Sequence, residues 1–514
     1  MLSRRICAPE GEEGGLVDTP HRLAPSKGSP VRIRLLTATA FLVALGGVVV
    51  AGVGNAGAAK NPRPTVAYHG KTIATQPKTR PANKAISYRG RALVLQQTYV
   101  GRGAAEPTIG LDKSGTAFFA ASAFDSVVGQ AHTIVLRSKD TNKSWKDVQP
   151  RAAGQDLHPQ SLDPYIYVDP DYGRVFTVDL IGNASEISYS DDKGETWSHT
   201  VASSAGVNDH QTLTFGPAPA ETNYPLLDPK LPKIGYYCAN TVAFETCARS
   251  FDGGASWTQL PTPPYTGAST QQGGGGFCGS LAGHLVTDRT GRVYMPKGHC
   301  GLPTIAASAD AGTTWKIVPV STKIGASDIQ TSVTADAAGN LFYVWWDNVF
   351  QLPYLSVSRD HGSTWSAPRM IAPPGVTQVN FPTIDAGDRG RIAITFPGTT
   401  GDPKDKDRPW NSYVVVSTDA LSSNPTFISS NANDPRDPVH RGACDARCGG
   451  MFDFLDVVVA PSGPGAVWAT ATDTCTKEAC TDPDGAARAA TDAAGVAIRQ
   501  VSGPALRGKK LYFP

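Results

Sequence analysis

The sequence lacks an excess of charge of either sign. Its 47 lysines and arginines are balanced by 45 aspartates and glutamates, so the formal net charge of the 514-residue chain is +2 at pH 7. A nucleic-acid-binding surface needs a basic patch or stripe, and no part of the sequence supplies one. We therefore expect no nucleic-acid partner.

Several motifs of common enzymes and metal sites are also missing. The chain contains no Walker phosphate loop, no H-E-x-x-H motif and no G-x-S-x-G turn. Its cysteines show neither C-x-x-C spacing nor accompanying histidines at the spacing of a zinc site. His210 and His284 could join carboxylates around a metal, but nothing fixes their separation. We expect no metal and no cofactor.

The first 58 residues resemble a leader. Residues 35–53 form an apolar run that is preceded by two arginines and followed by an A-x-A site at 56–58, the pattern of a secretory signal peptide. The run is also just long enough to cross a bilayer, so a retained signal anchor is the alternative. Residues 59–95 have the composition of a disordered spacer. Either interpretation predicts a protein that is secreted or held at the cell envelope.

Eight cysteines follow the leader, and an even number in an exported chain predicts disulfides. The last four could exchange partners among themselves. Otherwise we expect local pairs: Cys238 with Cys247 across a hairpin, Cys278 with Cys300, Cys444 with Cys448, and Cys475 with Cys480.

Glycine and proline are abundant and scattered, with 53 and 40 copies, which favours many short strands joined by turns. Among these turns, the pattern S-x-D-x-G-x-S/T-W occurs four times. Decayed copies at Asp140 and Asp419 extend it, so that the motif recurs every 50 to 60 residues. We call the four intact copies Asp turns. Their aspartates are Asp192, Asp252, Asp310 and Asp360.

A second turn of the form D-x-x-G recurs out of phase with the first, and each copy is followed by an apolar strand. Each unit therefore predicts four short antiparallel strands, which is the blade of a propeller. At this repeat length, residues 96–514 predict an all-β fold, a single seven-bladed β-propeller; six blades would need long insertions. The segment "RALVLQQTYV" could supply the outer strand of the last blade and close the ring.

Each residue of the Asp turn has a structural task. The carboxylate can accept hydrogen bonds from its own turn and from nearby hydroxyls, glycine supplies a positive φ, and tryptophan fills the gap between sheets. Acid–base catalysis needs carboxylates that converge on one point, whereas these would be spread around a ring. We expect the repeated aspartates to be structural.

The S-x-D-x-G-x-T-W turns resemble the Asp-box (BNR) repeats of the sialidase superfamily, over nearly the whole chain after the spacer. That resemblance implies a first-blade arginine in an F/Y-R-I-P motif, two further arginines that clamp a carboxylate, an aspartate acid and a tyrosine nucleophile assisted by glutamate. The nearest first-blade match, "YRGRALV" with Arg89 and Arg91, lacks the I-P. Only six glutamates follow the leader, and none stands beside a tyrosine in an obvious way. The catalytic set implied by the resemblance does not assemble.

A site, if present, is expected where the innermost strands begin at the mouth of the central channel. Polar residues at these starts either form a binding cup or bond one another to fill a narrow channel. As catalytic candidates we predict Asp163, Asp209 and Asp453, and as ligand-binding candidates His210, Gln211, His284, Asp328, Gln330 and Asn380.

Two functions follow. The first is a monomeric propeller that binds a glycan or an extracellular protein; the second is a divergent, sialidase-like glycoside hydrolase acting at the mouth through paired carboxylates.

Overall fold

The fold was analysed in a computed structural model. It describes residues 85–86, 92–124, 131–150, 161, 163–181, 184–203, 208–220, 224–241, 244–265, 281–327, 330–442, 454–474 and 494–514. Several predictions fall outside these ranges: the leader with its apolar run at 35–53, and the residues Arg89, Arg91, Cys278, Asp328, Cys444, Cys448, Asp453, Cys475 and Cys480.

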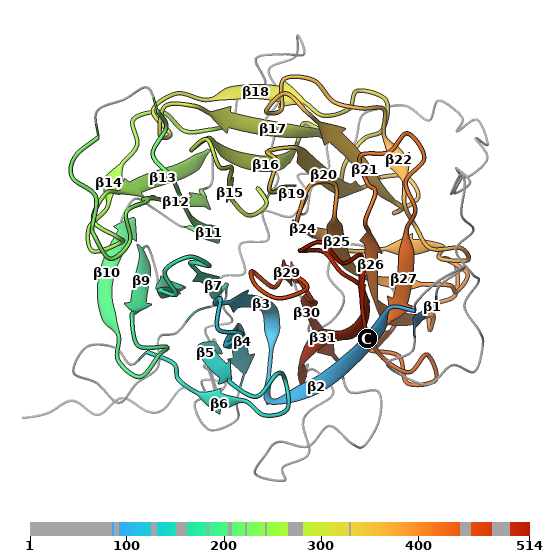
Figure 1. The fold of residues 1–514 in the computed structure, drawn as a ribbon. Coiled ribbons are helices and arrows are strands. Elements are labelled where there is room, and N and C mark those ends of the chain that lie inside the picture. The colour runs from blue at the N-terminus through green and yellow to red at the C-terminus, as the bar shows by residue number, and fades with distance from the viewer. Residues whose placement is uncertain are drawn as a thin grey trace, which may run out of the picture. The chain divides into compact units, whose positions relative to one another are not determined.

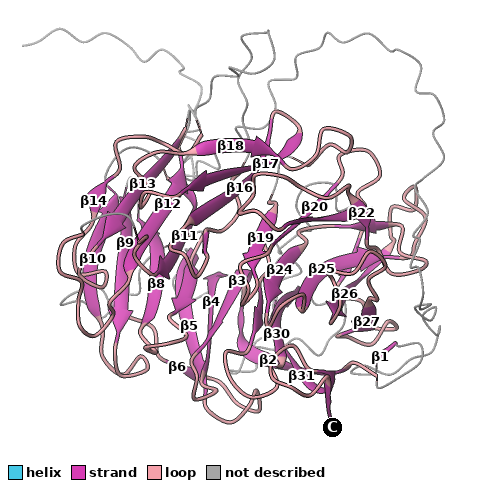
Figure 2. Cartoon of the chain, turned by 45° about the horizontal axis from the view of Figure 1, so that its top comes forward, coloured by secondary structure: helices cyan, strands magenta, loops and turns pink. Residues whose placement is uncertain are grey.

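The described chain is built of strands, with no helix in these ranges (Figure 2). From the axis outward, blade 1 contains β3 (Ala105–Leu111), β4 (Ala117–Phe124), β5 (Ala131–Ser138) and β6 (Lys146–Asp147). Blade 2 contains β7 (Tyr165–Val168), β8 (Val175–Ile181), β9 (Ala184–Ser190) and β10 (Ser198–Ser203). Blade 3 contains β11 (Asp209–Gly216), β12 (Ile234–Asn240), β13 (Glu245–Ser250) and β14 (Thr258–Gln259).

The next two blades repeat this order. Blade 4 contains β15 (Val286–Thr287), β16 (Val293–His299), β17 (Leu302–Ser308) and β18 (Lys316–Pro319). Blade 5 contains β19 (Ser332–Ala335), β20 (Leu341–Trp346), β21 (Pro353–Ser358) and β22 (Arg369–Met370).

The last two blades carry additional strands. Blade 6 contains β23 (Gln378–Val379), β24 (Thr383–Ala386), β25 (Ile392–Thr399), β26 (Pro409–Ser417), β27 (Ile428–Asn431) and β28 (His440–Arg441), with β1 (Ala85–Ile86) paired to β27. Blade 7 contains β29 (Val457–Val459), β30 (Val467–Asp473) and β31 (Ala494–Pro504), with β32 (Tyr512–Phe513) paired to β31. The seven antiparallel sheets form a ring around one axis (Figure 1), so the predicted seven-bladed propeller is confirmed and six blades are excluded.

The ring is closed by a strand from the start of the propeller. β2 (Val94–Gly103) pairs with β31 as the outermost strand of blade 7, with Leu95 opposite Gln500 and Tyr99 opposite Val496. Figure 1 shows this blue strand beside the dark red end of the chain. The predicted closing strand is therefore confirmed. Together with β1, it places ordered strand within the range 59–95 that the composition assigns to a spacer.

Aromatic side chains fill the spaces between neighbouring blades. Phe176 of blade 2 stacks on Phe215 of blade 3, with ring centroids 4.6 Å apart, and Tyr167 of blade 2 stacks on the same ring at 5.9 Å. Phe176 is fully buried, so each such contact ties one blade to the next through the hydrophobic effect.

The Asp turns join the third and fourth strands of blades 2 to 5. In blade 4, Asp310 accepts hydrogen bonds from the hydroxyl of Ser308 at 2.8 Å, and from the backbone N–H and hydroxyl of Thr314 at 2.9 and 2.7 Å. In blade 2, the side-chain and backbone hydrogen bonds from Thr196 lower the pKa of Asp192 to about 2. The equivalent bonds are present at Asp252 and Asp360. The outer strands that flank these turns are spread around the ring (Figure 1), and each carboxylate bonds within its own turn.

Arginines connect several Asp turns to the preceding blade. The guanidinium of Arg174 in blade 2 donates to the carbonyl of Gly253 at 2.7 Å, and Arg249 in blade 3 donates to the carbonyl of Ala311 at 3.0 Å. Both acceptors directly follow the aspartate of their turn, in a residue with positive φ. The turn thus presents a carbonyl that ties adjacent blades together.

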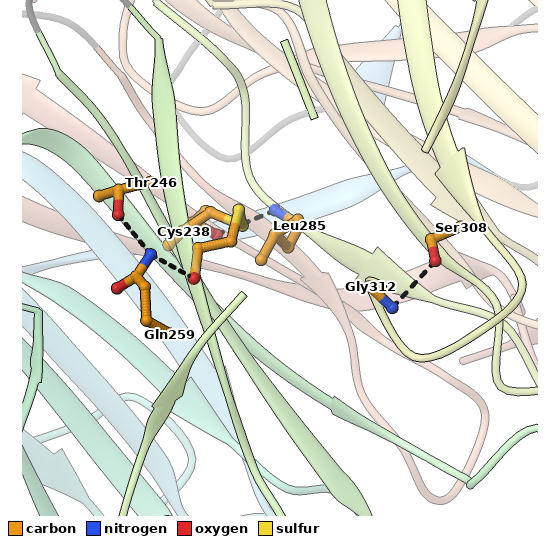
Figure 3. Close-up of a disulfide and its surroundings, with 8 residues drawn as sticks. Cys238, Thr246, Gln259, Leu285, Ser308 and Gly312 are labelled. Carbon is orange, nitrogen blue, oxygen red and sulfur yellow. Dashed lines mark hydrogen bonds between the residues drawn. A yellow bond between two sulfur atoms is a disulfide. The ribbon is translucent and has the colours of Figure 1, made fainter. Parts of the chain in front are cut away.

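The predicted disulfide between Cys238 and Cys247 is confirmed. The two residues lie opposite each other on β12 and β13. Figure 3 shows the bridge beside Gln259, whose amide donates to the carbonyl of Cys247 at 2.6 Å and to the hydroxyl of Thr246 at 2.7 Å. Cys300 is also disulfide-bonded, while its predicted partner Cys278 lies outside the described residues.

Two glycines at the same repeat position offer a matched test of the packing between blades. Gly115 and Gly291 both close a D-x-x-G turn, with φ of 84° and 82°. A Cβ on Gly291 would meet the Pro217 carbonyl oxygen at 2.5 Å, whereas a Cβ on Gly115 would meet nothing within 4 Å. We expect Gly115→Ala to cost about 1 kcal/mol for the left-handed backbone alone, and Gly291→Ala about 2 to 4 kcal/mol because overpacking is added. Urea unfolding measures both; equal losses would contradict the tight contact.

In the ranges that the structure describes, no helix is long and apolar enough to cross a membrane.

Candidate functional site

Hydrogen bonds link the innermost strands of the propeller around its axis. At six blade junctions, a polar side chain on or beside one inner strand accepts a hydrogen bond from a backbone N–H of the neighbouring inner strand. We call these six hydrogen bonds the axial ring. With the N–H donor named first and the side-chain acceptor second, they are Ile166 to Thr108 (3.0 Å), His210 to Asp163 (3.1 Å), Leu285 to Thr212 (2.9 Å), Ile384 to Ser332 (3.3 Å), Val459 to Asp385 (2.7 Å) and Ile109 to Asp456 (3.0 Å).

Two aspartates of the axial ring have perturbed acidities. Burial, with a smaller contribution from the charge of Asp385, raises the pKa of Asp456 to about 7, although the hydrogen bonds from the N–H groups of Ile109 and Val457 lower it. Burial likewise raises the pKa of Asp385. The sequence analysis missed both residues, because their role depends on amides from the neighbouring blade.

The structure brings three of the predicted residues together at the junction of blades 2 and 3. Asp163 is 8% exposed and its carboxylate accepts the N–H of His210. The side-chain amide of Gln211 donates to the carbonyl of Asp163, and both His210 and Gln211 are 1% exposed. This predicted catalytic carboxylate therefore serves as a tie between inner strands.

His210 and His284 do lie next to each other, as an aromatic stack. Their ring centroids are 5.4 Å apart, and Phe454 meets the two rings edge-on at 4.9 and 5.1 Å. Tyr165 covers His284 at 4.6 Å. Burial, with a further contribution from His210, holds the pKa of His284 well below its usual range. His284 is therefore a neutral imidazole at physiological pH.

The remaining predicted residues are distributed over other blades. Asp209 begins β11 and is partly exposed. Gln330 is 1% exposed and donates to the hydroxyl of Thr383 at 3.2 Å, which links blades 5 and 6. Asn380 is fully buried, and its side-chain oxygen accepts the N–H of Phe381 at 3.2 Å. Asp328 and Asp453 lie outside the described residues.

A rare backbone conformation recurs at the starts of four inner strands, and the sequence analysis missed it. Glu106, His210, Gln330 and Phe381 have φ between 27° and 53°, a region that non-glycine residues rarely adopt. Each stands two residues before a serine or threonine of an inner strand. The register of β3 and β11 shifts at this point, as in a β-bulge that redirects a side chain. In the sequence these positions are the triplets E-P-T, H-Q-T, Q-T-S and F-P-T, which share only the final serine or threonine.

One glutamate does lie near a tyrosine, at the junction of blades 3 and 4. Glu245 is 1% exposed and forms an ion pair with Lys297, whose ammonium lies 5.4 Å from the ring centroid of Tyr265. Burial holds the pKa of Tyr265 well above its usual range, and its hydroxyl donates to the carbonyl of Met295 at 3.0 Å. A tyrosine nucleophile needs an activated, more acidic hydroxyl. This pair does not supply one.

Metal-ligating side chains do not gather in the described ranges: no group of three or more His, Cys, Asp or Glu could hold an ion there.

The chain was compared with known proteins. No protein-family model matches it, and no curated protein matches it. Among solved structures it is similar to a protein of unknown function from Dyadobacter fermentans, with 14% identity, 79% of this chain and 98% of that chain covered, and a TM-score of 0.42.

Two other similar structures are enzymes. The NanB sialidase from Streptococcus pneumoniae shows 13% identity over 79% of this chain and 70% of its own, with a TM-score of 0.41. An alpha-L-arabinofuranosidase from Fusarium graminearum shows 12% identity over 64% and 93%, with a TM-score of 0.40. These likenesses are too distant to bear on substrate or activity.

Proposed function

We propose that the protein is an exported, non-catalytic propeller that binds a glycan at the mouth of its axial channel. The observation that carries this proposal is the use of the axial carboxylates as structural acceptors. Asp163, Asp385 and Asp456 each receive a backbone N–H from the next blade. A glycoside hydrolase needs two carboxylates available to the scissile bond, and these three are committed to holding the ring.

The groups around the mouth support binding in another way. Asp209 is partly exposed at the start of β11, directly before His210, which stacks with His284 and meets Phe454 edge-on. Sugars present hydroxyls that both donate and accept, together with apolar C–H faces. The carboxylate of Asp209 can accept hydrogen bonds from these hydroxyls, whereas His210 and Phe454 are each 1% exposed and belong to the packed wall rather than to the binding surface.

The proposal is tested by exposing the full-length protein to an array of neutral, N-acetylated and acidic glycans, and to fluorogenic glycosides that include sialosides. We expect binding without turnover. Asp209→Asn is expected to weaken glycan binding about tenfold, because a hydrogen bond to a charged group is worth roughly 1.5 to 3 kcal/mol.

Asp310→Asn serves as the control for that variant. Its carboxylate bonds only within an Asp turn, so the substitution should lower the unfolding temperature and leave glycan affinity unchanged. Turnover of a glycoside that disappears in Asp209→Asn would establish the hydrolase alternative instead. Silence on the glycan array would overturn the binding proposal.

A further inference from the structure

A cavity of about 510 Å³ opens at the junction of blades 1 and 2, between outer strands and away from the axial strands. Four structural elements contribute to it, one of which is β10 with His199. β6 supplies Lys146 and Asp147, the Asp turn of blade 2 supplies Glu195 and Trp197, and β2 supplies Arg102. Its size is within the range of small-molecule sites.

The charged groups of this cavity are largely arranged in pairs. Arg102 bonds Asp147, and Glu195 lies 2.8 Å from the guanidinium of Arg137. Lys146 is exposed and forms no ion pair within 4.0 Å with the described residues, and its positive charge contributes to lowering the pKa of Glu195 across the cavity. The side chains of Asp147 and Glu195 are 40% and 51% exposed, so each carboxylate keeps accessible acceptor sites.

The repeats provide an internal comparison, because a residue needed only for the fold should recur in each Asp turn. Glu195 stands between the glycine and the threonine of its turn. The corresponding residues in blades 3 to 5 are Ala255, Thr313 and Ser363. The turn forms with small uncharged residues at this position in all three other copies. The carboxylate is therefore not a requirement of the fold.

The tryptophan of this turn also departs from its counterparts. In blades 3 and 5, the indole N–H groups of Trp257 and Trp365 donate to the glycine carbonyl of their own turn, at 3.2 and 3.1 Å. The indole of Trp197 donates instead to the carbonyl of Val148 in blade 1, at 2.8 Å. This bond holds the ring across the junction as part of the cavity lining.

We infer that this cavity is a second saccharide-binding site, separate from the axial mouth. A sugar hydroxyl donates to a carboxylate and accepts from an ammonium, and the cavity offers both. The indole supplies an apolar wall for the C–H face of a sugar ring. A purely apolar ligand would desolvate these charged groups without offering them hydrogen bonds, and a simple anion would be repelled by two carboxylates. The inference extends the proposed function to a different place on the molecule.

The experiment compares the full-length wild type with the double variant Lys146→Ala/Glu195→Gln on the same array of neutral, N-acetylated and acidic oligosaccharides. Both side chains are exposed or half-exposed, so folding should be retained, and thermal unfolding checks this. We expect the double variant to lose at least tenfold in apparent affinity for one group of saccharides, while Asp209→Asn affects another group.

Lys316→Ala is the matched control. Lys316 begins β18 directly after Trp315, as Lys146 begins β6 directly after Trp145, and this variant should bind like the wild type. If the double variant retains the wild-type array pattern, the cavity inference is wrong, while the proposed function stands on the response to Asp209→Asn. If the wild type binds no saccharide, both fail. A loss of equal size in Lys316→Ala would also overturn the inference.

Discussion

Leu95→Asp is expected to destabilise the propeller by about 4 kcal/mol or more. Leu95 lies in the closing strand β2, is fully buried, and packs in a cluster with Val496 and Ile498 of β31. The substitution removes a buried leucine, which alone costs about 2 to 5 kcal/mol, and places a carboxylate there without a partner. Because β2 connects blade 7 to the start of the propeller, the substitution weakens the contact that closes the ring.

Denaturant unfolding followed by tryptophan fluorescence measures this effect. The control is Gln96→Asp, the next residue of the same strand. Gln96 is partly exposed and pairs with Arg499, so a carboxylate there should cost less than about 1 kcal/mol. Wild-type stability in Leu95→Asp would show that the closing strand contributes little to the fold.

Asp456→Ala is expected to cost about 2 to 5 kcal/mol. Its two carboxylate oxygens accept the N–H groups of Ile109 at 3.0 Å and Val457 at 2.8 Å. The alanine variant leaves both donors without their acceptor in a buried region, at roughly 1 to 3 kcal/mol each. The matched control is Asp388→Ala, which removes a similar acceptor from Gly508 at the surface, with Asp388 39% exposed. It should cost at most about 1 kcal/mol. Equal losses would contradict a special role for the axial ring.

The same residue predicts a pH dependence with a definite sign. Burial raises the folded-state pKa of Asp456 from 3.8 to about 7. Its contribution to the free energy of unfolding is therefore fully present below about pH 4 and is lost as the pH rises through 7. Relative to Asp456→Asn, the wild type should lose stability over this interval and show no further change above it. Asp192 acts in the opposite direction, since its pKa is lowered to about 2 and its contribution is lost only as the pH falls from 4 towards 2.

The parts of the fold that the sequence could predict are local or periodic. The bonds of Asp310 join residues two and four positions away, so the S-x-D-x-G-x-T-W pattern contains the complete turn. The repeat length predicts seven blades, and the missing outer strand of the last blade predicts β2. The Cys238–Cys247 bridge follows from a short hairpin.

The site was harder to predict because its bonds join distant parts of the chain. Asp456 bonds Ile109 across 347 residues and Asp385 bonds Val459 across 74. The register between neighbouring blades decides which polar residue of an inner strand forms such a bond. The periodicity of the sequence does not determine that register. The prediction selected Asn380, close to the axial acceptor Asp385 but not that residue. The blade 1–2 cavity likewise needs Arg102 from β2 beside β6, 45 residues further on.

The order in which the ring is completed constrains how the protein can be made. β2 is the first strand of its sheet to be synthesised, whereas its partner β31 begins at Ala494, 400 residues after Val94 at the start of β2. Since the strands of all seven blades must be present before these edges can meet, final assembly of the ring is expected to be slow.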